Sequence, residues 1–151
     1  DELGIRDRVR FVGKRQPDEL RYYYSAGDVA VTTPWYEPFG LTPLEAQACG
    51  RPVIGSAVGG ITFTIRDGRT GFLVAPRAPE ALADRLEFLL AQPELMAQMG
   101  KAARERVERE FTWATVAERT AALYGSLLAA PRPRVRPAAR QTATTRPHLA
   151  P

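Results

Sequence analysis

The stretch that decides the fold is Thr33-Pro-Trp-Tyr-Glu-Pro-Phe-Gly-Leu-Thr-Pro-Leu-Glu-Ala-Gln-Ala-Cys-Gly50. It follows a β-branched apolar run, crosses a loop with two prolines and a glycine, and then reads as a helix. Thr42 suits the N-cap of that helix, Pro43 its first position, and Glu45 the third position of a capping box. A strand, a loop and a helix start in this order are typical of a ligand site, because the first N–H groups of the helix point at whatever lies above the loop.

Strand and helix patterns alternate outward from this stretch. The sequence predicts strands at residues 9–12, 28–32, 53–56 and 71–74. It predicts helices at residues 17–25, 42–49, 61–66, 79–91, 93–110 and 112–128. This alternation indicates an α/β fold with a Rossmann-like parallel sheet followed by C-terminal helices. Ligands bind beyond the carboxyl ends of such strands, so the loops at 34–41 and 57–60 should share one edge of the sheet.

The segment Glu37-Pro-Phe-Gly-Leu-Thr-Pro-Leu-Glu45 resembles the E-x7-E motif of retaining glycosyltransferases of the GT-B class, family 4. The match continues, with order and spacing preserved, in Ala46, Ala48, Gly50, Pro52-Val-Ile54, Gly59-Gly60 and Asp67-Gly-Arg-Thr-Gly-Phe72. The resemblance covers roughly residues 3–128. It implies part of the C-terminal, donor-binding half of a GT-B fold.

The resemblance also implies the reaction. A nucleotide-diphosphate sugar would be the co-substrate, and its hexose would pass with retention to a hydroxyl acceptor, either a sugar, a lipid or a small molecule. Neither a cofactor nor a metal is implied. Glu37 would contact the hexose and is the candidate catalytic residue. Glu45 would hold the ribose, since a carboxylate can accept from two vicinal hydroxyls.

The remaining candidate donor-binding residues supply backbone rather than side chains. They are Phe39, Gly40, Leu41 and Thr42 at the helix start, and Gly59 and Gly60 in the next loop. Each candidate has an alternative. Glu45 can serve only the capping box, Glu37 can be a solvated loop acid, and the glycine pair can be an ordinary turn. Trp35 and Tyr36 either wall a sugar or base, or cover the sheet edge.

The sequence also departs from the family. Members carry another domain ahead of this one, and they begin this domain with a Gly-Arg turn and a Lys that grip the diphosphate; neither is found here. We therefore expect a fragment, truncated at its N-terminus, in which residues 1–130 form a partial donor-binding domain with little or no activity alone. Its partner would be the missing N-terminal GT-B domain. The alternative is a non-catalytic nucleotide-binding or interaction module derived from the same fold.

Charge and composition limit the other functions. The net charge of +4 resides in residues 131–151, which hold five arginines and no acid and leave 16 basic against 17 acidic residues elsewhere. We expect this tail to be disordered, with weak contact to a membrane surface as an alternative, and we expect no nucleic-acid partner. The single cysteine, Cys49, and the absence of an apolar run of about 20 residues favour a cytoplasmic protein, peripheral to the inner face of a membrane at most.

Overall fold

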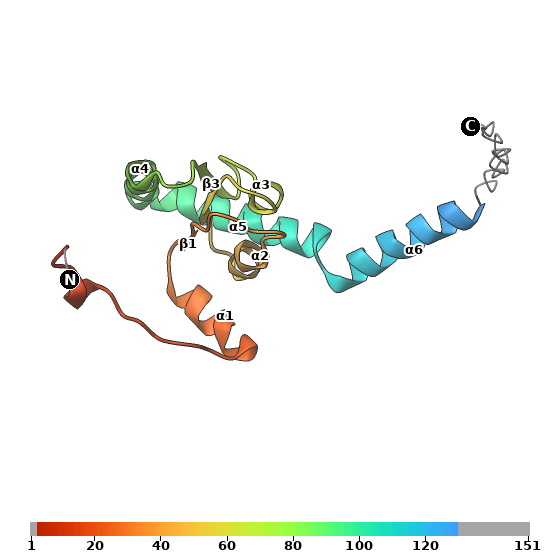
Figure 1. Cartoon of the computed structure of the whole chain (residues 1–151), viewed down its shortest axis with the longest axis horizontal. Helices are drawn as coiled ribbons and strands as arrows, with labels where there is room; N and C mark the ends of the chain where they lie inside the picture. Colours follow the sequence, from red (N-terminus) through yellow and green to blue (C-terminus); the bar gives the residue numbers. More distant parts are fainter. Residues whose placement is uncertain (1–2, 130–151) are drawn as a thin grey trace, which may run out of the picture. The chain divides into compact units, whose positions relative to one another are not determined.

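The computed structural model describes residues 3–129. Three strands alternate with helices along the chain (Figure 1). The elements in order are a 3-10 turn at Arg6–Arg8, α1 (Pro17–Ala26), β1 (Ala30–Thr32), α2 (Leu41–Ala48), β2 (Val53–Ser56), α3 (Ile61–Thr64), β3 (Gly71–Val74), α4 (Pro79–Leu90), α5 (Pro93–Glu110) and α6 (Trp113–Ala129).

The strands form a parallel sheet in the order β1-β2-β3. Val53 in β2 pairs with Ala30 on one side and with Gly71 on the other. All four residues of β2 are buried, as expected for a parallel strand covered on both faces. The predicted α/β fold with a Rossmann-like parallel sheet and C-terminal helices is therefore confirmed.

Each face of the sheet packs against its own set of helices. One core joins strand residues to α4 and α5, and consists of Ile54, Phe72, Val74, Leu89 and Met99. The other joins the opposite face to α2 and α3, and consists of Ala46, Val53, Ile61 and Ile65. Because neighbouring residues of a strand point to opposite faces, Val53 and Ile54 belong to different cores.

The predicted strand at residues 9–12 is wrong. The segment is extended coil, and Phe11 is 95% exposed. A strand needs a neighbour for its backbone N–H and C=O groups. Among the described residues β1 pairs only with β2, so no strand partner reaches this segment. The short helix predicted at 61–66 also ends earlier, at Thr64.

The predicted capping box of Thr42 and Glu45 is wrong as well. Helix α2 begins at Leu41, and its N-cap is Gly40 in the left-handed region with φ 92°. Glu45 therefore lies beyond the first turn, too far along to reach the N-cap. A capping contact of this type occurs in α1 instead, where the Gln16 backbone N–H donates to the Glu19 carboxylate at 2.9 Å.

Helix α3 is held by Arg106, which extends from α5 and is 4% exposed. Its guanidinium donates to the carbonyl oxygens of Thr64 and Phe63 at the end of α3, the second at 2.8 Å. Its Nε donates to Glu110 at 3.0 Å. Burial lowers the pKa of Arg106 from its ordinary value, while the Glu110 carboxylate opposes that shift. The cation satisfies helix carbonyls that α3 leaves without partners.

Contacts divide the chain into two units, Asp1–Ala117 and Glu118–Pro151. The described part of the second unit is the end of α6, where the Ser126 hydroxyl donates to the Leu123 carbonyl oxygen at 2.7 Å. The predicted boundary at residue 130 and the predicted tail lie outside the described residues and stay predictions. Within residues 3–129 no helix is both long and apolar enough to cross a membrane.

Candidate functional site

The loop between β1 and α2 is organised by the Glu37 carboxylate. Its Oε1 accepts the backbone N–H of Gly40 at 2.9 Å and that of Phe39 at 3.3 Å. Gly40 is required there, because its φ of 92° is left-handed and a Cβ would stand 2.7 Å from the Thr64 hydroxyl. Glu37 thus binds the N–H of the N-cap residue Gly40, while no side chain caps the first N–H groups of α2 itself. The second carboxylate oxygen of Glu37 accepts no hydrogen bond from any described residue.

The two glycines of the next loop pack against this one. The Gly60 N–H donates to the Glu37 carbonyl oxygen at 2.9 Å. A Cβ on Gly59 would stand 2.1 Å from the Glu37 carbonyl oxygen, and a Cβ on Gly60 equally close to that of Phe39. The prediction that the loops at 34–41 and 57–60 share one edge of the sheet is therefore confirmed. The close approach that the glycine pair allows is to the Glu37 loop, and its role toward a ligand stays a prediction.

Glu45 projects from the exposed side of α2, and its carboxylate has one hydrogen-bond partner among the described residues. Its Oε2 accepts the hydroxyl of Tyr24, on α1, at 3.0 Å. Burial, and then the hydrogen bond to Glu45, raise the pKa of Tyr24 to about 12, while the Thr42 hydroxyl acts in the opposite direction. The phenol therefore stays a neutral donor across the physiological range. Since no described residue donates to Oε1 of Glu45, that oxygen is available to a ligand.

The four backbone N–H groups predicted to bind a donor fall into two pairs. Those of Phe39 and Gly40 already donate to Glu37. Those of Leu41 and Thr42, the first two residues of α2, find no acceptor among residues 3–129. Free N–H groups at a helix N-terminus attract negative charge. The second pair is thus the better placed to meet the oxygens of a diphosphate or sugar.

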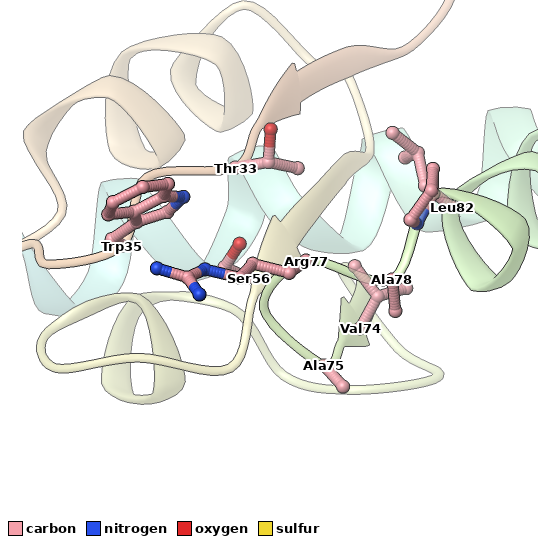
Figure 2. A pocket seen from close by; sticks show the side chains of 9 residues that line it. Thr33, Trp35, Ser56, Val74, Ala75, Arg77, Ala78 and Leu82 are labelled. Atoms are coloured by element: carbon pink, nitrogen blue, oxygen red, sulfur yellow. The ribbon is translucent and has the colours of Figure 1, made fainter.

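A cavity of about 240 Å³ opens at the same edge of the sheet (Figure 2). Its lining comes from the ends of all three strands and the start of α4: Thr33, Trp35, Ser56, Val74, Ala75, Arg77, Ala78, Pro79 and Leu82. The guanidinium of Arg77 lies over the Trp35 ring, 4.1 Å from its centroid. Trp35 lines this cavity, whereas Tyr36 is exposed and outside the lining. Whether Trp35 contacts a sugar or base stays a prediction.

Sequence reasoning missed two residues of the candidate site and its surroundings, Tyr24 and Arg77. Tyr24 lies in a run of three tyrosines on a predicted helix, and nothing local marks the one that reaches Glu45. Among the described residues, Arg77 is the one non-glycine residue with a left-handed φ, 60°. No local sequence pattern predicts this conformation. Among residues 3–129 there is no group of three or more His, Cys, Asp or Glu able to hold a metal ion.

Comparison with known proteins identifies the family. The description "Glycosyl transferases group 1" matches residues 1–106. A D-inositol 3-phosphate glycosyltransferase of Corynebacterium glutamicum is 41% identical over 129 residues, which are 85% of this chain and 31% of that protein. The corresponding protein of Corynebacterium diphtheriae is 46% identical over 82% of this chain and 29% of its own length. The chain thus spans about a third of the curated relatives it matches.

Superposition on solved structures supports the same family assignment. A sucrose-phosphate synthase from Thermosynechococcus elongatus superposes with a TM-score of 0.79 and 46% identity, over 86% of this chain and 33% of that one. The Anabaena protein HepE, solved in complex with UDP and glucose, superposes with a TM-score of 0.77 and 28% identity, over 83% of this chain and 34% of that one. The chain accordingly belongs to the glycosyl transferases group 1 family and has the fold of the C-terminal region of a GT-B glycosyltransferase.

Proposed function

We propose that this chain is the nucleotide-sugar-binding part of a retaining, family 4 hexosyltransferase that acts without a metal ion. The observation that carries the proposal is the Glu45 carboxylate, which is exposed and held on one oxygen by Tyr24. Its other oxygen can accept from the ribose diol, and charged hydrogen bonds of this kind contribute about 1.5–3 kcal/mol each. The UDP and UDP-glucose complexes of the HepE neighbour support this choice of ligand.

The developing charge of the reaction would collect on the diphosphate leaving group. The free N–H groups of Leu41 and Thr42, at the positive end of α2, can stabilise it, which is the main catalytic contribution expected of such a site. Glu37 keeps one carboxylate oxygen on its own loop. Its second oxygen remains for the hexose, so we propose that it orients the donor sugar rather than attacking it.

The acceptor is proposed to be a hydroxyl compound bound with help from a second domain. The related proteins are named D-inositol 3-phosphate glycosyltransferases and a sucrose-phosphate synthase, so a polyol or sugar is the favoured class. The 151-residue chain, which spans about a third of those relatives, should bind donor nucleotide yet transfer no sugar by itself.

The test is calorimetric titration of the chain with UDP, with GDP and ADP in parallel. Glu45→Ala should weaken binding of the preferred nucleotide by about tenfold or more, because it removes a charged acceptor. The matched control is Glu87→Ala, which changes an exposed helical glutamate on α4. Equal affinities for the parent and Glu45→Ala would remove the ribose role, and a parent that binds none of the three nucleotides would remove the donor-binding proposal.

A further inference from the structure

The cavity of Figure 2 is separate from the proposed donor contacts of Glu37 and Glu45. Neither Glu37 nor Glu45 lines it, although it opens at the same carboxyl edge of the sheet. Thr33 follows β1, Ser56 ends β2 and Val74 ends β3. This edge is where parallel α/β sheets bind ligands. At about 240 Å³ the cavity is smaller than the roughly 300–1,000 Å³ of drug-sized pockets, so it suits one sugar-sized ring rather than a whole nucleotide.

The charge of the cavity comes from Arg77. Its guanidinium is stacked over the Trp35 indole at 4.1 Å from the ring centroid, and Figure 2 shows the two side chains together at one end of the cavity. Stacking fixes the plane of the guanidinium while leaving its N–H edge open. No described residue accepts a hydrogen bond or forms an ion pair with Arg77. A planar, unpaired donor fork at a cavity is suited to an oxyanion.

The backbone conformation of Arg77 supports the same interpretation, that its side chain belongs to the cavity. Its φ of 60° lies in the left-handed region, which is unfavourable for a residue with a Cβ. Glycine would occupy this position without strain. With this backbone conformation, the arginine side chain lies over Trp35 and lines the cavity.

The rest of the lining is compatible with an anion. Of the nine lining residues, all within the described part of the chain, none is acidic. The twelve-residue helix α4 begins here, and its N-cap Ala78 makes no side-chain capping bond. The positive end of α4 therefore adds to the charge of Arg77. Glu80, the acid of the first turn, is outside the lining. The hydroxyls of Thr33 and Ser56 can bond to the hydroxyls of a ligand.

We propose that this cavity is a subsite for a small phosphorylated sugar or polyol. Arg77 takes the phosphate, Trp35 supports the guanidinium and covers one side of the ring, and the hydroxyls of Thr33 and Ser56 meet ring hydroxyls. The proposal does not depend on nucleotide binding at Glu45.

The test uses the fluorescence of Trp35 in the 151-residue chain. Trp113, the other tryptophan, is 88% exposed, so Trp113→Phe leaves Trp35 as the reporter. This protein is titrated with glucose 6-phosphate, inorganic phosphate and glucose. Arg77→Gly removes the guanidinium and suits the backbone, so the fold should persist, which circular dichroism checks. The matched control is Arg85→Gln, since Arg85 also stacks on an aromatic ring, that of Phe72, at 4.8 Å.

We expect a saturable change with glucose 6-phosphate, and competition by inorganic phosphate. Arg77→Gly should weaken the binding of glucose 6-phosphate by about tenfold or more, because it removes a charged hydrogen-bond donor. Arg85→Gln should bind glucose 6-phosphate with an affinity within about twofold of that of the parent. The proposal is overturned if the parent shows no saturable response, if glucose binds as well as its phosphate, or if Arg77→Gly binds like the parent. UDP titration of Glu45→Ala, which leaves the cavity intact, shows separately whether the donor site fails.

Discussion

The Tyr24→Phe substitution tests whether a residue on α1 positions the Glu45 carboxylate. It removes one hydroxyl, which donates to Glu45 Oε2 at 3.0 Å, and keeps the ring that packs against the second core. Hydrogen bonds to charged groups contribute about 1.5–3 kcal/mol, and ordinary ones about 0.5–1.5 kcal/mol. Glu45 is exposed, so water weakens this bond. We therefore expect Tyr24→Phe to weaken the binding free energy of UDP by about 1 kcal/mol, which raises its Kd about fivefold.

The assay is a double-mutant cycle by calorimetric titration with UDP. It compares the parent, Tyr24→Phe, Glu45→Gln and the double variant. Since the hydroxyl acts through Glu45, the cycle should show a coupling of about 1 kcal/mol. Tyr23→Phe is the control, because the neighbouring hydroxyl has no hydrogen-bond partner among the described residues. If Tyr24→Phe weakens UDP binding by the same factor in the parent and in the Glu45→Gln variant, the positioning role is refuted.

Burial of Tyr24, together with its hydrogen bond to Glu45, predicts a pH dependence of stability. The pKa of Tyr24 is raised from 10.0 to about 12 in the folded state, so the folded state holds that proton more tightly than the unfolded state. The contribution is therefore fully present below about pH 10 and is lost as pH rises toward 12. Urea unfolding should show a stability difference between the parent and Tyr24→Phe that is constant up to about pH 10 and changes above it.

Two further predictions concern the scaffold of the site. Arg106→Leu should lower the free energy of unfolding by about 1.5–3 kcal/mol, because it removes charged hydrogen bonds to the Phe63 and Thr64 carbonyl oxygens and to Glu110. Thr64 keeps the Gln47 side chain as a donor, and Glu110 keeps Arg109. Arg104→Leu, which breaks only an exposed ion pair with Glu108, should cost less than about 1 kcal/mol; equal urea midpoints for the two variants would contradict this reasoning. Gly60→Ala should cost about 1–3 kcal/mol, since its Cβ would meet the backbone of Phe39. Gly125→Ala, whose Cβ meets nothing within 4 Å in α6, should be neutral or stabilising by up to about 1 kcal/mol, and a thermal scan in which both alanines behave alike would count against the packing argument.

Local patterns in the sequence were enough for the architecture and for the edge of the sheet that carries the site. The proline at the first turn of α4 and of α5 and the glycine after α2 mark helix ends through properties of single residues. The apolar run of β2 predicts a strand that is covered on both faces. Because parallel strands end at a common edge, the meeting of the Glu37 loop with the glycine pair also followed from element order.

The tertiary structure alone decided which groups are paired and which are free. Tyr24 reaches Glu45 across 21 positions, and Arg106 reaches the end of α3 across more than 40. The N-cap of α2 is Gly40 instead of Thr42, because Gly40, packed against Thr64, adopts a left-handed conformation two residues earlier. The strand-like pattern at residues 9–12 forms no strand, since pairing needs a neighbour and no property of the segment supplies one. Propensity and capping act over a few residues, whereas pairing and burial depend on distant segments that only the folded chain brings together.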